Sequence, residues 1–415
     1  MTVSDAGRVR RLVVLDPMGN PGGGSRFVRR LLPAMREVRP DMSIRFVGNP
    51  LSIAREGIRG ELAAAGIDVR PLEWAPNIPW KSRPLRSRLG FRFRRRIDPR
   101  NWDLASATQR RMTQELQTAT AACDIAYFSW PYWLRAPRLS RPMVTTVHDL
   151  NYRYFFGTPV FSHADALELD AQIDGWIRAA TAVASSDFMA AEIAAHYPGR
   201  RPVQVVRLAP FAAATSEIDA SSNTRTFGRY IICPTHLTVH KNLGPLIAAH
   251  AILGRRYPGL KLVITGVGTE AATGRATPIG STRSGDDPDV VGLGYVTNRE
   301  IDALIAGAAV AVNPSLYEAG NGPGLDAWSL GTPVAMSDIP AFREHLTEQG
   351  VEAMLFDPRS PDDIAAKIAS ILDAPEEWAM AAARSQAIVE KRTWEHVAAE
   401  YLAVFDQAFR KGPDG

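Results

Sequence analysis

The sequence S-L-Y-E-A-G-N-G-P-G-L-D-A-W-S-L-G-T-P-V-A-M-S-D-I-P-A-F-R-E, residues Ser315 to Glu344, decides how the chain is interpreted. An apolar strand is expected to end just before this stretch, and a glycine-rich turn follows it. Pro323 suits the first helical position, because the N–H that proline lacks has no helical partner there. Gly322 to Leu325 therefore form a helix N-terminus, whose free N–H groups and positive dipole end favour a diphosphate.

Two carboxylates flank this predicted anion site. Glu318 precedes it, and Asp326 lies one turn into the helix. Carboxylates repel phosphate, so they are expected to accept hydrogen bonds from hydroxyl groups, for which a sugar and a ribose are the obvious donors. The alternative is a helix-capping acid and a surface acid near an ordinary turn.

Outward from this stretch, short apolar segments alternate with longer amphipathic ones, which is typical of βαβ units around a parallel sheet. The strands predicted in the first half are 12–16, 43–48, 69–73, 125–130, 143–147, 182–185 and 204–208. Those predicted in the second half are 230–233, 261–265, 290–292, 310–313, 333–336 and 354–356. The predicted helices are 26–38, 53–65, 104–122, 164–180, 188–196, 243–253, 298–306, 323–330, 361–372, 376–389 and 394–409.

The pattern is interrupted once, where residues 209–228 become small and polar, as expected of a linker. The expected organisation is a first Rossmann-like domain over 1–208, the linker, a second such domain over 229–392, and a final helix in 393–415 that returns to the first domain. The fold class is α/β, with two doubly wound domains. Ligands bind at the C-terminal ends of such strands, so the site is expected in the interdomain cleft.

Three further segments are candidates for this cleft. Lys241, in C-P-T-H-L-T-V-H-K-N-L (Cys233 to Leu243), precedes a predicted helix and suits a diphosphate as a point charge, or is a solvated surface charge. In the first half, His148 and Asp149 end a predicted strand. The glycines Gly22, Gly23 and Gly24 permit a backbone to approach a ligand closely, although they lack the spacing of a dinucleotide fingerprint.

The segment from Ser315 to Glu344 resembles the signature of glycosyltransferase family 4, retaining enzymes of the GT-B fold. That signature is E-G-F-G-L-P-x-x-E-A, followed by G-T-P-V-x-x-S-D-x-P-x-x-x-E. Asp326 stands where the family has Glu, and Asn321-Gly322 replaces the usual Gly-Leu. The matching positions are Glu318, Pro323, Asp326, Ala327, Gly331, Thr332, Pro333, Val334, Ser337, Asp338, Pro340 and Glu344.

The resemblance implies roles for particular residues. Glu318 and His148 would contact the transferred sugar, the backbone from Asn321 to Leu325 would hold the diphosphate, and Asp326 would bind the ribose. Lys241 would stabilise the departing diphosphate. The other implied donor contacts are Gly23 and Gly24, Tyr295 and Val296 beside the base, and Thr235, which replaces an arginine of the family, so that His236 or His240 substitutes in part.

The implied activity is transfer of a mannose-type or glucose-type hexose with retention, from GDP-mannose or a UDP-hexose to a saccharide or a lipid-linked acceptor. The nucleotide sugar is a substrate, and no cofactor or metal is expected. Asp286 to Asp289 contains an Asp-x-Asp, but at the end of a Gly/Ser/Thr-rich loop that does not favour a metal site. The rival interpretations are a nucleotide-sugar epimerase or hydrolase of the same fold, and a non-catalytic scaffold that binds nucleotide sugars.

Composition sets further bounds. The chain has 415 residues, 46% of them hydrophobic, and two cysteines, Cys123 and Cys233, which fits a reducing cytoplasm. The formal charge of +4 conceals a basic segment, residues 81–100, that suits an anionic membrane surface or a phosphate-bearing acceptor. The same segment is equally well a solvated loop. No nucleic-acid module accompanies it, so a nucleic-acid partner is not expected.

Overall fold

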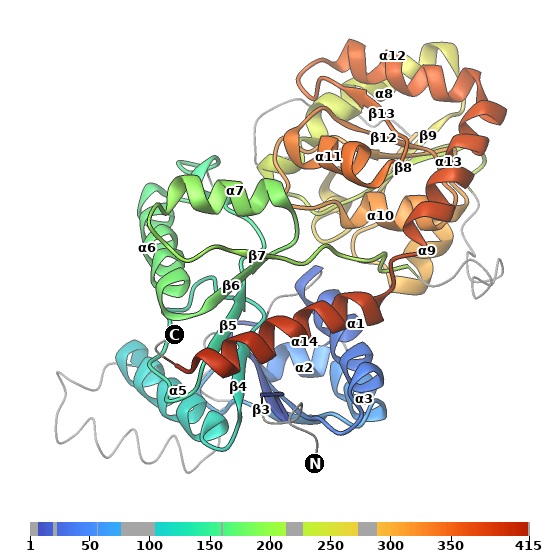
Figure 1. The fold of residues 1–415 in the computed structure, drawn as a ribbon. Coiled ribbons are helices and arrows are strands. Elements are labelled where there is room, and N and C mark those ends of the chain that lie inside the picture. Colours follow the sequence, from blue (N-terminus) through green and yellow to red (C-terminus); the bar gives the residue numbers. More distant parts are fainter. Residues whose placement is uncertain are drawn as a thin grey trace.

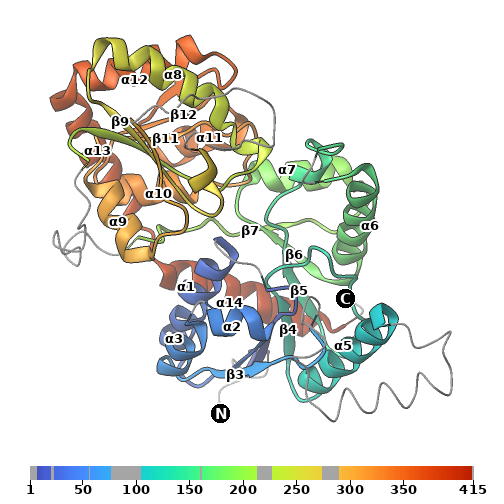
Figure 2. The same cartoon turned by 180° about the vertical axis from the view of Figure 1, so that it is seen from behind.

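The computed structural model describes residues 7–19, 23–55, 57–75, 104–158, 161–212, 227–272 and 289–413. It has two lobes, each built on a parallel sheet with helices on both faces (Figures 1 and 2). In the first lobe, alternate residues of the strand at residues 11–16 point to opposite faces of the sheet and pack with different helices. Leu12 and Val14 pack with the first and last helices of the chain, whereas Val13 and Leu15 pack on the other face with Met112 and Leu116.

The first lobe carries a seven-stranded sheet in the order β3-β2-β1-β4-β5-β6-β7. All of its strand pairs are parallel. Its strands are β1 (Arg11–Asp16), β2 (Ser43–Gly48), β3 (Asp68–Pro71), β4 (Ile125–Phe128), β5 (Met143–Thr146), β6 (Thr181–Ala184) and β7 (Gln204–Val205). Its helices are α1 (Gly23–Val38), α2 (Pro50–Arg55), α3 (Ile58–Ala64), α5 (Leu104–Thr120), α6 (His163–Ala179) and α7 (Asp187–His196).

The second lobe carries a six-stranded parallel sheet in the order β10-β9-β8-β11-β12-β13. Its strands are β8 (Tyr230–Pro234), β9 (Lys261–Thr265), β10 (Val290–Gly292), β11 (Val310–Asn313), β12 (Val334–Ser337) and β13 (Met354–Phe356). Its helices are α8 (Leu243–Arg256), α9 (Asn298–Ala306), α10 (Gly322–Ser329), α11 (Pro340–Glu344), α12 (Pro361–Asp373) and α13 (Pro375–Val389). The strand order reverses at β1 and at β8, so ligands are expected beyond the C-terminal ends of these strands and their neighbours.

The last helix, α14 (Trp394–Lys411), lies along α1 in the first lobe (Figure 1). Its apolar face, including Tyr401 and Phe405, is part of the same buried cluster as Leu12 and Phe27. Asp406 of α14 accepts hydrogen bonds from the Val9 N–H at 2.8 Å and from two guanidinium nitrogens of Arg39, each at 2.8 Å. The chain therefore crosses between the lobes twice.

The predicted architecture of two Rossmann-like domains is confirmed, and most predicted strands agree with the structure to within a residue or two. The prediction of one helix over 53–65 is wrong. Gly57, at φ +66°, separates α2 from α3, because this left-handed conformation interrupts a helix. Only residues 204–205 of the predicted strand 204–208 pair with the sheet. Helix α11 and the π-helical turn His345–Gln349 after it were not predicted.

Several predicted features lie wholly or partly outside the described residues: the basic segment 81–100, Gly22, most of the linker, and all of the Asp-x-Asp segment except Asp289. In the part of the chain that is described, no helix combines the length and apolar character needed to cross a membrane. Cys123 and Cys233 are both buried with free thiols.

Candidate functional site

An ion pair between Lys241 and Glu318 lies at the C-terminal edge of the second sheet. Lys241 ends a short turn (Val239–Lys241) that follows β8, and Glu318 follows the neighbouring strand β11. The two side chains are only 14% and 18% exposed. Burial alone raises the pKa of Glu318, but the charge of Lys241, with hydrogen bonds from Lys241 and Ser315, lowers it below the usual value. Glu318 is therefore ionised at neutral pH.

His148 follows β5 at the facing edge of the first sheet. Its Nε2 lies 2.7 Å from the carbonyl oxygen of Ser129. Because a carbonyl only accepts, Nε2 carries the proton and Nδ1 is left as an acceptor. Burial lowers the pKa of His148 to about 4, so the ring is neutral at pH 7. The rings of Trp130 and Phe27 pack against it, with centroids 5.0 Å and 5.6 Å away.

Contacts between the lobes bring these two edges together. The Leu150 N–H donates to the Tyr317 hydroxyl at 3.2 Å, and the rings of Phe155 and His240 lie 5.7 Å apart. Burial, assisted by the negative charge of Glu318, raises the pKa of Asp149 to about 6, against the opposing effects of the Asn151 N–H and of Lys241. The turn at His148 and Asp149 and the Lys241–Glu318 pair therefore face one another across the boundary between the lobes.

The raised pKa of Asp149 predicts a pH-dependent stability. Its value of about 6 in the folded protein exceeds the ordinary 3.8, so the folded state holds more protons between these values and stability falls as pH rises through this window. We expect Asp149→Asn to remove this dependence and to stabilise the protein at pH 7 by up to about 3 kcal/mol. Urea unfolding at pH 5 and pH 7 measures both effects. Asp41→Asn, which replaces an exposed carboxyl, is the control. If the free energy of unfolding of Asp149→Asn changed with pH as much as that of the parent protein, Asp149 would not be the group responsible.

The N-terminus of α10 differs in part from the predicted diphosphate site. Asn321 caps the helix, and its Oδ1 accepts the Gly324 N–H at 2.9 Å. Pro323 has no N–H, and the Leu325 N–H donates to the carbonyl of Asn321 at 2.9 Å. The Phe211 ring lies against Gly322, since a Cβ added there would be 3.4 Å from it. Three of the five positions from Asn321 to Leu325 therefore offer no free N–H to a diphosphate in this conformation.

Asp326 also lies elsewhere than the sequence suggests. It is fully buried, and its Oδ1 accepts the N–H groups of Phe211 at 2.6 Å and Ala212 at 2.9 Å. Its Oδ2 pairs with Arg26 of α1 at 3.0 Å. Asp326 therefore joins the second lobe to the first lobe and to the segment after β7. A ribose reaches it only if that segment and Arg26 move away.

The remaining predicted residues lie around the same edges. Gly23 and Gly24 begin α1, and a Cβ on Gly23 would meet open space. His240 is buried, and its pKa is lowered by burial to about 3. The Thr235 N–H donates to the Thr265 carbonyl at 2.8 Å, which ties the residue after β8 to the last residue of β9. Tyr295 is 61% exposed, and Val296 packs on the second-lobe core.

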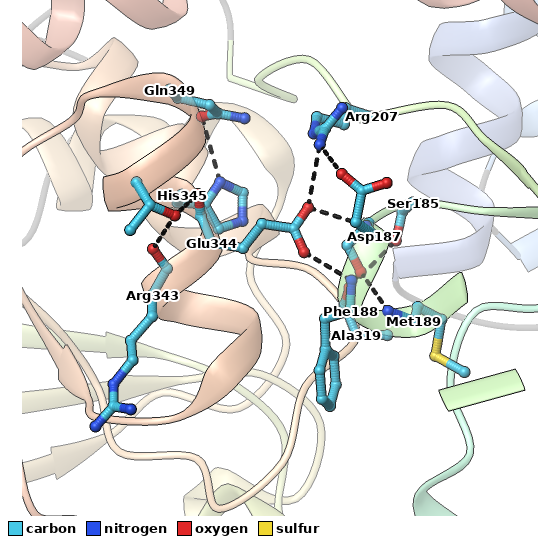
Figure 3. A network of polar contacts seen from close by, with 12 residues as sticks. Ser185, Asp187, Phe188, Met189, Arg207, Ala319, Arg343, Glu344, His345 and Gln349 are labelled. Carbon is cyan, nitrogen blue, oxygen red and sulfur yellow. Dashed lines mark hydrogen bonds and ion pairs between the residues drawn. The ribbon is translucent and has the colours of Figure 1, made fainter. Parts of the chain in front are cut away.

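A second set of contacts between the lobes was not predicted (Figure 3). The carboxylate of Glu344 accepts the N–H groups of Asp187 at 3.0 Å and Phe188 at 2.8 Å, so it caps α7 from the opposite lobe. Arg207 lies 3.5 Å from the same carboxylate. The Ser186 hydroxyl donates to the Ala319 carbonyl at 2.5 Å, next to Glu318. These contacts favour a closed arrangement of the lobes.

The comparisons with known proteins agree with this geometry. Residues 228–374 match the model of the family glycosyl transferases group 1. The MMP alpha-(1->4)-mannosyltransferase of Mycolicibacterium hassiacum is 33% identical over 117 residues, 28% of this chain and 28% of that protein. Glycogen synthase of Mycobacterium tuberculosis is 28% identical over 281 residues, 65% of this chain and 64% of that protein. The chain thus spans less than two thirds of the length of these relatives.

Solved structures resemble the whole described architecture. Anabaena HepE, in complex with UDP and glucose, has a TM-score of 0.64 at 16% identity and covers 96% of this chain and 100% of its own. Sucrose-phosphate synthase from Thermosynechococcus elongatus has a TM-score of 0.67 at 15% identity, over 97% of this chain and 100% of its own. The fold is therefore GT-B, with two Rossmann-like domains facing one another. Among the described residues no group of three or more His, Cys, Asp or Glu side chains is suited to a metal ion.

Proposed function

We propose that the protein is a glycosyltransferase that moves a hexose, of the mannose or glucose type, from a nucleoside diphosphate sugar to a saccharide or lipid-linked acceptor. The observation that carries the proposal is the buried Lys241–Glu318 pair opposite His148, at the edges where the two sheets face one another. The match of residues 228–374 to group 1 glycosyl transferases supports it. The similarity to a mannosyltransferase and a glycogen synthase supports a hexose.

The site chemistry suits such a transfer. Glu318 is ionised and accepts hydrogen bonds, so it holds hydroxyl groups of the donor sugar. His148 is neutral, and its Nδ1 accepts a further hydroxyl. Lys241 is the cation placed to stabilise charge that develops on the departing diphosphate. A donor entering the site competes with Lys241 for Glu318, and the diphosphate replaces the carboxylate as the partner of the lysine.

We also propose that the transfer retains the anomeric configuration and needs no metal. In such a reaction the departing diphosphate oxygen accepts the proton of the acceptor hydroxyl on the same face of the sugar, while Lys241 stabilises its charge. Two contacts close the lobes: Glu344 accepts hydrogen bonds from the N-terminus of α7, and Ser186 donates one to the carbonyl of Ala319. Closure excludes water and so limits hydrolysis of the donor.

A screen of nucleotide sugars by thermal shift tests donor binding. We expect GDP-mannose or a UDP-hexose to raise the melting temperature, because a ligand at about 100 times its Kd stabilises the native state by about 2.7 kcal/mol. Each kcal/mol shifts Tm by about 2–4 °C for a domain of 150–250 residues and by about 1 °C for a unit of 415 residues, so we expect Tm to rise by a few degrees. The corresponding free neutral sugars, which lack the nucleoside diphosphate, are the control ligands.

The bound donor is then incubated with and without saccharide and lipid-linked acceptors, and NMR of the products gives the anomeric configuration. Transfer only in the presence of an acceptor, with the donor configuration kept, is the expected result. Donor isomerised or hydrolysed without an acceptor would identify an epimerase or hydrolase of the same fold. Binding without turnover would identify a scaffold, and an inverted product would refute retention.

A further inference from the structure

Exposed aromatic rings gather on the first lobe, on two segments that follow β4 and β5. Trp133 is 43% exposed and Phe156 is 49% exposed, although tryptophan and phenylalanine are highly buried on average. The rings of Trp133 and Phe161 are nearly parallel, with an interplanar angle of 20° and centroids 6.5 Å apart. Phe156 forms a β-bridge with Phe161, and its ring lies 5.2 Å from that of His163. We call these four residues the aromatic platform.

The backbone of Trp133 is strained. Its φ of +60° lies in the left-handed region, which bulky residues rarely occupy. Both of its neighbours, Tyr132 and Leu134, are buried and anchored. The Leu134 carbonyl accepts the indole N–H of Trp176 at 2.6 Å, and the Tyr132 hydroxyl donates to the Asp149 carbonyl at 2.6 Å. The exposed ring is therefore held by its surroundings in a conformation that asparagine or glycine would adopt more readily, which indicates a role for the ring itself.

The segment after β4 connects the platform to the candidate site. Trp130 packs its ring against that of His148, with centroids 5.0 Å apart. Trp133 lies only three residues further along the chain, so the Cα atoms of the two tryptophans are at most about 11 Å apart. The platform therefore lies close to His148, on the same lobe.

The segment after β5 reaches the boundary between the lobes. The Phe155 ring packs against His240 of the second lobe, with centroids 5.7 Å apart. Thr158 fixes the turn that follows, because its hydroxyl donates to the Phe155 carbonyl at 2.8 Å and its N–H donates to the Phe161 carbonyl at 3.1 Å. Phe156 and Phe161 are thereby held next to this contact. The platform adjoins the edge at which the proposed transfer takes place.

Charges near the platform favour a neutral ligand over an anionic membrane surface. Asp165, in the first turn of α6, accepts hydrogen bonds from the Ser162 hydroxyl at 2.7 Å and N–H at 3.0 Å, which lower its pKa, so it is ionised at neutral pH. Arg135, two residues after Trp133, is already paired with Glu168. An ionised acid and a neutralised arginine do not attract anionic lipid. The exposed Arg135–Glu168 pair does offer donors and acceptors to hydroxyl groups.

We propose that the aromatic platform binds a neutral oligosaccharide, one ring of which stacks on Trp133. The C–H groups of a sugar ring are attracted to the electron-rich face of an aromatic ring, while its hydroxyls remain free to form hydrogen bonds. The inference rests on the proposed function, and it specifies the acceptor as a saccharide of more than one residue. One end of that acceptor lies at His148 and a later residue lies on Trp133.

Calorimetric titration of the full chain, without donor, tests the platform. The probes are maltoheptaose and a mannan oligosaccharide, and glucose and mannose are the monosaccharide controls. We expect at least one oligosaccharide to bind, and both monosaccharides to bind far more weakly. Trp133→Asn is expected to weaken binding by about 10-fold or more, as loss of a tryptophan from a binding surface usually does, and to melt like the parent protein, because asparagine tolerates the left-handed backbone. Trp133→Tyr, which keeps a ring, is expected to retain most of the binding.

Met380→Asn is the matched control, because Met380 is also a large apolar side chain, 58% exposed, but lies on α13 of the second lobe. Co-sedimentation with vesicles of phosphatidylcholine and phosphatidylglycerol tests a membrane as the occupant instead. Lys241→Ala is expected to bind the oligosaccharide like the parent protein, so failure of the proposed transferase activity leaves this measurement unaffected.

Oligosaccharide binding that Trp133→Asn weakens and Met380→Asn keeps supports the platform. Four results would overturn it: neither oligosaccharide binds, the monosaccharides bind equally well, Trp133→Asn binds like the parent protein, or the vesicles bind and Trp133→Asn removes that binding. If Trp133→Asn melts early, Phe156→Asn, at the other exposed ring, decides in its place.

Discussion

Lys241→Ala is expected to lower kcat for hexose transfer by about 100- to 1000-fold, the usual effect of removing one preorganised group that stabilises a developing negative charge. The lysine lies at the C-terminal edge of β8, and Glu318 is its ion-pair partner among the described residues. Without the lysine, Glu318 loses its ion-pair partner and the departing diphosphate of the proposed reaction loses the cation that stabilises it. A steady-state assay of product formation under saturating donor measures the effect.

Two features distinguish a chemical role from a structural one. The pKa of Glu318 is lowered chiefly by the charge of Lys241, so the variant is expected to show a pH profile shifted upward on its acidic limb. Lys391→Ala, at an exposed lysine after α13, is expected to retain full activity. If the Lys241→Ala variant melts like the parent protein and also transfers hexose at the parental rate, the proposed role of the site is contradicted.

The largest effect on stability is expected for Asp406→Ala. This carboxylate, in α14, lies in a buried ion pair with Arg39, and the two side chains are 11% and 8% exposed. Removal of one partner of a buried pair leaves an uncompensated charge and typically costs about 3–5 kcal/mol. The Val9 N–H also loses its acceptor. We expect the urea midpoint to fall, as monitored by tryptophan fluorescence.

Two variants control this experiment. Asp338→Ala breaks the exposed pair with Arg343, whose side chains are 36% and 60% exposed, and is expected to cost at most about 1 kcal/mol. Replacement of both Arg39 and Asp406 by apolar residues is expected to cost less than Asp406→Ala alone, because no charge is left unpaired. If Asp406→Ala and Asp338→Ala lowered the free energy of unfolding equally, the Arg39–Asp406 pair would not be what holds α14 in place.

The strands could be predicted closely because both faces of each parallel sheet are buried. Such a strand appears in the sequence as a short, continuous apolar stretch bounded by turn residues, as in Lys261–Thr265 and Val310–Asn313, so it can be recognised without knowledge of distant contacts. The helix predicted over 53–65 failed at Gly57, because glycine adopts the left-handed conformation about as readily as the helical one, so its presence in the sequence does not show which of the two occurs. Helix α11 has five residues, too few for a periodic pattern to be recognised.

The candidate site was predictable only in part, for a different reason. Lys241, Glu318 and His148 follow strand ends, and the ends of adjacent parallel strands meet at one edge, so their proximity follows from topology. The partners of Asp326 and Glu344 are 115 and 157 residues away in the sequence. No local pattern specifies such contacts. An acid in a motif indicates that a carboxylate is needed at that position. It does not indicate whether the carboxylate binds a ligand or accepts hydrogen bonds from the other lobe.

The return of α14 to the first lobe has a consequence for synthesis on the ribosome. Residues 394–411 complete the core around Leu12 and Phe27, and they are the last part of that core to leave the exit tunnel. All strands and helices of the second lobe, from Tyr230 to Val389, emerge earlier and are contiguous. Multidomain chains generally fold from the N-terminus first. In this chain all elements of the C-terminal lobe are therefore synthesised before the N-terminal lobe receives its closing helix.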